Sequence, residues 1–402
     1  MPDLKIHRRQ ILSSLGVAGA LAAAPRFAFA AEPTDKRLVV ILLRGAMDGL
    51  SAAPACGDPD FERARRGLAI ARPGQADGAL ALDALFGLHP ALAGLHDRYA
   101  KRELIIFHAI ASPYRDRSHF DGQNLIENGS DAPYGLPDGW LNRALLGLPE
   151  ARRQGRTDLG VALAPSMPLM MRGPARVTSW SPSLLPAPQA DLIARVRALY
   201  DETDPKLAMA LTEAEGANAT TGAAGGRASG GQEFVTLMTA AAKFMAESNG
   251  PCVAMIDSTG WDTHANQAGA YSPLTRNLAT LDHGLSALAD GLGPRWSSTA
   301  VVVVTEFGRT VAMNGTAGTD HGTASAAFLV GGAVAGGRVI ADWPGLKPGD
   351  LYAGRDLKPT ADLRSLTKAA LRDHLGVDEA RLEAAVFPGS KAAKPFDGLF
   401  RS

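Results

Sequence analysis

Four consecutive valines at residues 301–304 constrain the fold of this chain more than any other segment. An uninterrupted β-branched run is typical of a strand covered on both faces, as in a parallel sheet. The run ends in Thr305 and Glu306, and beyond a glycine-rich loop the chain reaches Asp320 and His321. Because ligands of open α/β sheets bind beyond the carboxyl ends of the strands, this order predicts a ligand site after the valines.

Further apolar runs predict additional strands of the same sheet, and amphipathic stretches between them predict helices. We expect strands at residues 38–43, 104–108, 161–164, 252–256 and 326–330. We expect helices at residues 90–101, 119–128, 189–202, 233–248, 271–292 and 361–375. Strands that alternate with helices predict an α/β fold with a mostly parallel central sheet and helices on both faces.

Residues 31–402 are expected to form a single domain. Apolar residues make up 46% of the chain, which is ample for a large core. Residues 216–231 are small and nearly uncharged, a composition that predicts a flexible loop. Since strand-like runs flank this loop on both sides, it does not by itself indicate a domain boundary.

The N-terminus has the layout of a bacterial export signal. Arg8 and Arg9 precede an apolar run at residues 15–24, and Ala28-Phe29-Ala30 offers a cleavage site. We therefore interpret residues 1–30 as a twin-arginine signal peptide that directs the protein to the periplasm through the Tat pathway. A chance arginine pair on the general secretory route is the alternative. The apolar run is shorter than the roughly 20 residues of a membrane span, so we expect no stable span after cleavage.

The charge balance gives no reason to expect a nucleic-acid partner. The chain has 41 basic and 41 acidic residues, and loss of residues 1–30 removes four basic residues and one acidic residue, leaving 37 and 40. A nearly neutral chain lacks the excess of positive charge that attracts nucleic acid or anionic membranes. Cys56 and Cys252 are the two cysteines. Export permits a disulfide, but the sequence leaves their pairing open.

Polar side chains follow four of the expected strands. In chain order they are Asp48; Ser118 and His119 at a helix start; Asp262 and His264; and Glu306, Asp320 and His321. Because parallel strands end at one edge of a sheet, we expect these groups to lie close together. Carboxylates and imidazoles are ligands for hard or borderline divalent ions, so the pattern predicts a metal site.

Motifs along nearly all of the mature chain resemble those of the bacterial family DUF1501, which is uncharacterised and Tat-exported. They are LLRGAMDGLSAAP at 42–54, LHPAL at 88–92, RSHFDGQNLIENG at 117–129, WDTH at 261–264, TEFGRT at 305–310, TDHG at 319–322 and GGRVIADWPGL at 336–346. The order of the polar clusters also resembles the alkaline-phosphatase-like superfamily, which includes the sulfatases. The resemblance implies an alkaline-phosphatase-like fold.

The superfamily resemblance implies a metal-assisted site for phosphate or sulfate esters. The residues it places at the metal are Asp48, Asp262, His264, Glu306, Asp320 and His321. It implies Ser118 as the nucleophile, beside His119, with Arg117 or Arg309 binding the anion; Arg44 and Arg115 are alternatives. A metal would lower the pKa of the hydroxyl and screen developing charge, and the helix that begins after Ser118 would add backbone donors.

One departure from the superfamily pattern reduces the ligand set. Where the superfamily pairs Asp with His after the late strand, this chain has Glu306-Phe307, and Phe307 cannot bind a metal. The remaining residues suit one divalent ion, zinc, manganese or calcium, better than two. We expect an exported hydrolase that acts on a small anionic ester or a glycan. The alternative is a non-catalytic protein on the same fold that binds anions or glycans or serves in assembly.

The candidate residues at the first two strand exits also have structural interpretations. Asp48 precedes a glycine, a common turn pair. Ser118 precedes an expected helix, where serine is a good N-cap. Ser112 is a second hydroxyl near Ser118, although Ser112-Pro113 is typical of a turn.

The later candidates have structural alternatives as well. Asp262 and His264 share one side of an extended chain, but they could instead form a loop network with Trp261. Asp257 is closer to its strand end and is a rival ligand. Glu306 and Arg309 could form a structural ion pair. The histidines expected to be structural or on the surface are His89, His96, His108, His283 and His374.

Overall fold

The structure is a computed structural model that describes residues 36–149, 158–182, 190–221 and 231–401. Residues 36–402 form one compact unit. The predicted signal peptide, residues 1–30, lies outside the described residues. Within the described ranges, no helix is both long and apolar enough to cross a bilayer.

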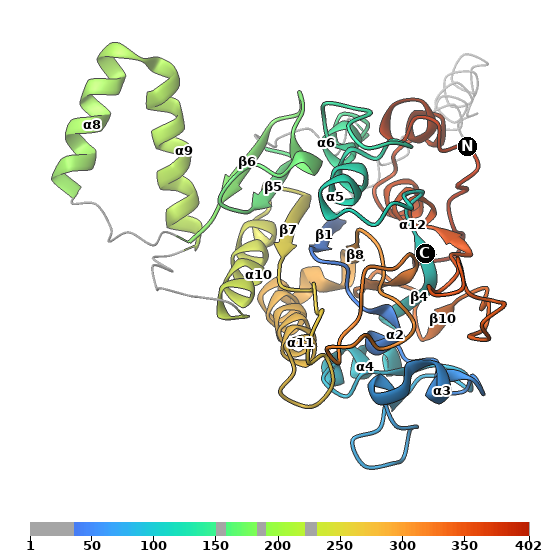
Figure 1. Cartoon of the computed structure of the whole chain (residues 1–402). Coiled ribbons are helices and arrows are strands. Elements are labelled where there is room, and N and C mark those ends of the chain that lie inside the picture. The colour runs from blue at the N-terminus through green and yellow to red at the C-terminus, as the bar shows by residue number, and fades with distance from the viewer. Residues whose placement is uncertain (1–35, 150–157, 183–189, 222–230, 402) are drawn as a thin grey trace, which may run out of the picture. The chain divides into compact units, whose positions relative to one another are not determined.

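The described residues form a nine-stranded central sheet (Figure 1). The strands are β1 Arg37–Leu43, β4 Leu104–Ala111, β5 Gly160–Leu163, β6 Val177–Trp180, β7 Val253–Ser258, β8 Thr299–Thr305, β9 Ser325–Val330, β10 Arg338–Ile340 and β11 Ala361–Asp362. Their order is β10-β4-β9-β8-β1-β7-β5-β6, with β11 also paired to β4. Strand β9 runs antiparallel to β4 and β8, and the other pairs are parallel. The predicted mostly parallel α/β sheet is confirmed.

Helices cover both faces of this sheet. One face packs against α4 Ala93–Ala100, α10 Gly231–Ala246 and α11 Pro273–Leu292. The other packs against α5 His119–Asn128, α6 Trp140–Leu145 and α12 Leu363–Ala369. Successive side chains of β1 alternate between these two cores, because strand side chains point to opposite faces. A fully buried strand thus requires the continuous apolar run seen in the sequence.

The remaining elements are short or lie away from the central sheet. They are α2 Gly49–Ala52, α3 Phe61–Arg65, α8 Ala190–Thr203, α9 Pro205–Thr221, α13 Glu379–Arg381 and a small hairpin of β2 Leu80–Ala81 with β3 Gly87–Leu88. Short helical segments of other types are η1 Arg66–Leu68, η2 Leu169–Met171, η3 Gly293–Ser298, η4 Ala370–His374 and η5 Leu382–Val386.

Each expected strand and helix has a counterpart, with shifts at the ends. Strand β4 continues three residues past the expected end, because 109–111 are also apolar. The flexible loop expected at 216–231 differs in part: residues 216–221 complete α9, where the Thr221 hydroxyl donates to the Ala217 carbonyl at 3.0 Å. Residues 222–230 lie outside the described residues.

The direction of β9 matters for the site. Because β9 is antiparallel to β8, its first residue lies at the edge where β1, β7 and β8 end. The connection from β8 to β9, residues 306–324, therefore begins and ends at that edge. It brings both Glu306 and His321 to the carboxyl ends of the parallel strands.

Candidate metal centre

Three histidines from separate segments of the chain, one of them the first residue of α5, bring their Nε2 atoms close together. The Nε2 atom of His321 lies 2.9 Å from that of His119 and 3.1 Å from that of His264. Asp262 completes the group: its Oδ1 lies 3.0 Å from His264 Nε2 and 3.3 Å from His321 Nε2. Its Oδ2 lies 3.4 Å from His119 Nε2. The structure thus brings together four of the predicted site residues.

The opposite ring nitrogen of each histidine has an oxygen partner. The Nδ1 atom of His119 lies 2.9 Å from Glu306 Oε1. The Nδ1 atom of His321 lies 2.9 Å from the Arg117 carbonyl oxygen, and that of His264 lies 3.3 Å from Asp320 Oδ1. Since these oxygens can only accept, Nδ1 carries the hydrogen of each neutral ring and the Nε2 lone pair faces the cluster. Metal-binding histidines are oriented in this way.

The donor atoms fit one divalent ion. A tetrahedral ion with ligand bonds of about 2.0–2.1 Å holds its ligand atoms about 3.3–3.4 Å apart. The separations within the group of His119, Asp262 and His321 lie between 2.9 and 3.4 Å, and His264 lies beside this group, 3.1 Å from His321 Nε2. Imidazole nitrogens and carboxylate oxygens such as those of this group are ligands of zinc and other borderline ions.

Glu306 lies behind His119 instead of beside the Nε2 atoms. Its carboxylate is fully buried, and Oε1 accepts from the Gly45 amide at 2.8 Å and from Gln123 Nε2 at 3.0 Å as well as from His119. Burial opposes ionisation of Glu306, but the hydrogen bonds from His119 and Gln123 outweigh it and lower the pKa. The first of these bonds also raises the pKa of His119. The expected ligand role of Glu306 does not fit this placement; it orients His119.

Asp48 belongs to a separate buried network. Its carboxylate pairs with Arg65 and accepts from Gln267 Nε2, from the Ser51 hydroxyl at 2.9 Å and from the Leu50 amide at 3.1 Å. It is also the N-cap of α2. Burial opposes ionisation, and the Arg65 charge overcomes it, so the pKa is lowered. With its oxygens occupied in this way, Asp48 does not fit the expected ligand role, and the structural interpretation describes it better.

The two candidate hydroxyls make structural hydrogen bonds. Ser118 is the N-cap of α5, where its Oγ accepts from the Asp121 amide at 3.5 Å. Its own amide donates to the Tyr114 hydroxyl at 3.1 Å. Ser112 is buried, and its hydroxyl lies 3.5 Å from the Glu306 carbonyl oxygen. Of the Ser118-His119 pair, the histidine is the residue that enters the cluster.

Two candidate anion-binding arginines are already occupied. Arg309 is buried; its Nη1 donates to Asp262 Oδ1 at 2.6 Å and its Nε to the Thr319 hydroxyl at 3.0 Å. It therefore holds the carboxylate of the cluster. Arg44 lies 2.8 Å from a Glu127 oxygen and 2.9 Å from an Asp257 oxygen. Asp257, the rival ligand, is thus paired with Arg44, although burial still raises its pKa.

Phe307 forms a wall of the site at the position where the resemblance expects a histidine. Its ring stacks on His119, with centroids 5.0 Å apart and planes 29° apart. It is buried with Ala46, Tyr114 and Leu125. Phe307 therefore fixes the ring plane of His119 from the side, while Glu306 fixes its Nδ1.

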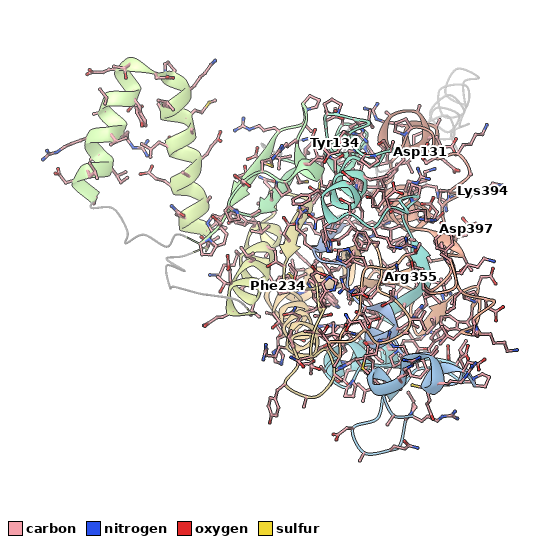
Figure 2. The ribbon with its side chains drawn as sticks, in the orientation of Figure 1. Asp131, Tyr134, Phe234, Arg355, Lys394 and Asp397 are labelled. Atoms are coloured by element: carbon pink, nitrogen blue, oxygen red, sulfur yellow. The ribbon has the colours of Figure 1, made fainter. Side chains whose placement is uncertain are left out.

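Sequence reasoning missed three residues that support the cluster. Asn314 Nδ2 donates to the His264 carbonyl at 3.0 Å and to Asp320 Oδ1 at 3.1 Å. Arg355, labelled in Figure 2, donates to the His321 carbonyl, and Asp356 forms an ion pair with Arg355. The Asn314-Gly315 turn signal was a usable clue for Asn314. Arg355 and Asp356 carry no local signal, because they reach the site only through folding.

The family of the chain follows from its sequence as a whole. The family described as "Protein of unknown function (DUF1501)" matches residues 109–386. This chain belongs to the DUF1501 family. A search among curated proteins finds no match.

Solved structures similar to this DUF1501 protein include enzymes of ester hydrolysis. The PsFucS1 sulfatase from Pseudoalteromonas sp. is 13% identical, with a TM-score of 0.41 over 98% of this chain and 75% of that one. The C-terminal periplasmic domain of EcEptC from Escherichia coli, solved with Zn, is 10% identical, with a TM-score of 0.38 over 89% and 87%. The alkaline phosphatase from the Antarctic bacterium TAB5 is 13% identical, with a TM-score of 0.34 over 74% and 91%. At these TM-scores, the function has to be argued from the residues of the site.

Proposed function

We propose that this DUF1501 protein is an exported, metal-dependent hydrolase of phosphate or sulfate esters. The supporting observation is the convergence of the Nε2 atoms of His119, His264 and His321 with the Asp262 carboxylate. A divalent ion held there would polarise an ester oxygen and lower the pKa of an attacking hydroxyl. Zinc suits the nitrogens of His119 and His321 and the Asp262 oxygen.

The other residues of the site would keep this ligand set in place. Glu306 and Asp320 accept from two of the ligand rings, and Arg309 holds Asp262. Such outer partners fix ring orientation and raise ligand basicity. Ser118 would supply the attacking hydroxyl, at the N-terminus of α5 and next to His119.

A second candidate function is supported by the same residues. Phe307 occupies the position of an expected ligand, Asp48 is paired with Arg65, and the Ser118 hydroxyl caps a helix. A protein with one metal and an occupied hydroxyl would bind an anion or a glycan without cleaving it.

Metal content and activity, measured together, test these proposals. We expect the purified mature protein to hold about one equivalent of zinc, manganese or calcium by mass spectrometry after dialysis. His321→Ala removes a ligand and should abolish retention, whereas His283→Ala, at an exposed position on α11, should not. Turnover of aryl phosphates or aryl sulfates that requires the metal supports the hydrolase, and retained metal with no turnover supports the binding protein. A wild-type protein that holds no metal after loading would refute both.

The predicted export is tested separately. A reporter fused after residues 1–40 should reach the periplasm, and replacement of Arg8 and Arg9 by lysines should block it. Continued export of the double-lysine variant would point to the general secretory route.

A further inference from the structure

One buried carboxylate holds two arginines beside the metal cluster. Asp356 is fully buried, and its Oδ2 accepts from Arg117 Nε at 2.8 Å and from the Thr323 hydroxyl at 2.8 Å. Arg117 Nη2 lies 2.7 Å from the same oxygen. Arg355 Nε lies 2.9 Å from the other oxygen, Oδ1. The Arg117 guanidinium is therefore hydrogen-bonded to Asp356, and the Arg355 guanidinium forms an ion pair with the same carboxylate.

Both arginines also contact His321, one of the four candidate ligands. The Arg117 carbonyl accepts from His321 Nδ1 at 2.9 Å, and Arg117 holds a left-handed backbone conformation with φ of 62°. Arg355 Nη2 donates to the His321 carbonyl at 2.6 Å. The Arg355 guanidinium thus reaches the backbone of His321, while Arg117 meets the ring of His321 through its own backbone carbonyl.

The loop that carries Arg355 is held at both ends. Tyr352 and Asp356 exchange backbone hydrogen bonds of 2.9 and 3.0 Å. The Val311 amide, in the connection from β8 to β9, donates to the Arg355 carbonyl at 3.1 Å. The backbone of Arg355 is therefore held by the same connection that carries His321. Little conformational entropy of this loop would be lost when a ligand binds.

The two arginines keep unused donors that face solvent. Their side chains are 24% and 44% exposed for Arg117 and Arg355. Among the residues that the structure describes, Nη1 of neither arginine donates a hydrogen bond. Arg117 and Arg355 bring two positive charges to this part of the site, where Asp356 pairs with both and the Asp320 carboxylate also lies within electrostatic reach of Arg355. Guanidinium groups bind tetrahedral oxyanions through paired N–H groups, so the pair is suited to such a ligand.

We propose that Arg117 and Arg355 form the oxyanion-binding subsite of this protein, with Asp356 as their positioning residue. The ligand class is a tetrahedral, anionic phosphate or sulfate group, and neutral carboxylic esters are disfavoured because they bring no charge to the pair. This assignment rests on the proposed function for its place in a reaction. It replaces Arg309 and Arg44, whose donors are taken by Asp262, Glu127 and Asp257.

Anion titration tests the subsite independently of catalysis. Inorganic phosphate and, separately, sulfate are titrated by calorimetry into the zinc-loaded full-length mature protein and into Arg355→Met. Loss of charged hydrogen bonds should weaken affinity for the preferred anion about 10- to 100-fold. Arg355→Lys should restore part of the affinity, and Arg372→Met, in another exposed Arg–Asp pair, should leave it unchanged. The anion with the larger effect identifies the ester class.

Zinc content, measured on every sample, separates this proposal from the metal centre. Arg355→Met with full zinc and unchanged affinity for both anions would overturn the subsite. If the wild type holds no zinc, the proposed hydrolase fails, but the same titration still tests the subsite, because Asp356 and not the metal anchors the arginines. Absence of anion binding by the wild type, with or without zinc, would also overturn it.

Discussion

Replacement of Asp48 by asparagine tests which carboxylates serve the fold and which serve the site. The change keeps the shape of the side chain and the oxygen that accepts from the Leu50 amide. It removes the negative charge that faces Arg65, and both residues are almost completely buried. Arg65 would then be a buried charge without its counter-ion.

The expected effect on stability is large. Removing one partner of a buried ion pair destabilises a protein by about 3–5 kcal/mol. Unfolding entropy of about 2.1 cal/mol/K per residue, summed over roughly 370 residues, turns this into a fall in Tm of about 4–6 °C. Zinc content should not change, because Asp48 is not among the residues that converge on the Nε2 atoms of the cluster.

The assay compares melting by scanning fluorimetry in chelator with zinc content after reloading. Arg65→Met is the matched control, since it leaves Asp48 unpaired and should lower Tm by a similar amount. The double variant should be less destabilised than the sum of the two single variants, because the pair is lost only once. An Asp48→Asn protein that melts at the wild-type temperature in chelator but no longer retains zinc would refute this reasoning. That result would indicate that Asp48 is a metal ligand.

Three further predictions concern the walls of the site and the core. Glu306→Gln removes the charged acceptor of His119, so zinc affinity should fall about 10- to 100-fold in competition with a chelator; equal affinity would mean that the ring needs no such partner. Phe307→Leu removes the ring stacked on His119 and should lower zinc affinity more than the same change at the buried Phe86, a matched control away from the cluster. The pKa of His108 is lowered to about 4, chiefly by burial. The unfolded chain therefore takes up this proton first, and stability that is complete above about pH 6.5 should fall by about 3 kcal/mol as pH drops through 4. Because the pKa of His89 is also lowered to about 4, urea titrations should show a loss in both proteins that is smaller by about 3 kcal/mol in His108→Gln, and parallel pH curves would refute it.

The sequence predicts the strands well because their causes are local. A run such as residues 301–304 can be buried in only a few ways, and β8 forms there. The antiparallel direction of β9 was not foreseen, since an apolar run reads the same in either direction. Direction depends on the connection that precedes the strand.

The site was predicted less well, because a ligand is defined by what its side chain meets. Asp48 and Asp262 both follow strands, yet Asp48 meets Arg65 from α3 while Asp262 meets three histidines. No feature near Asp48 distinguishes the two outcomes. The sequence indicated His119 only as a neighbour of Ser118, because its place in the cluster depends on which side chain the start of α5 turns toward His321.

The spread of the cluster along the chain has a consequence for how the protein folds. His119 and His321 are 202 residues apart, and His264 and His321 are 57 apart. Contacts between residues so far apart in the sequence form slowly, because the entropy cost of closing the long loop comes before the contacts stabilise the chain. The cluster needs α5, the exit of β7 and the connection into β9 together, so a partly folded chain has no metal centre. If the proposed metal centre holds an ion, that ion should leave the folding rate unchanged and slow only unfolding, so that release of the ion would report the first large opening of the native protein.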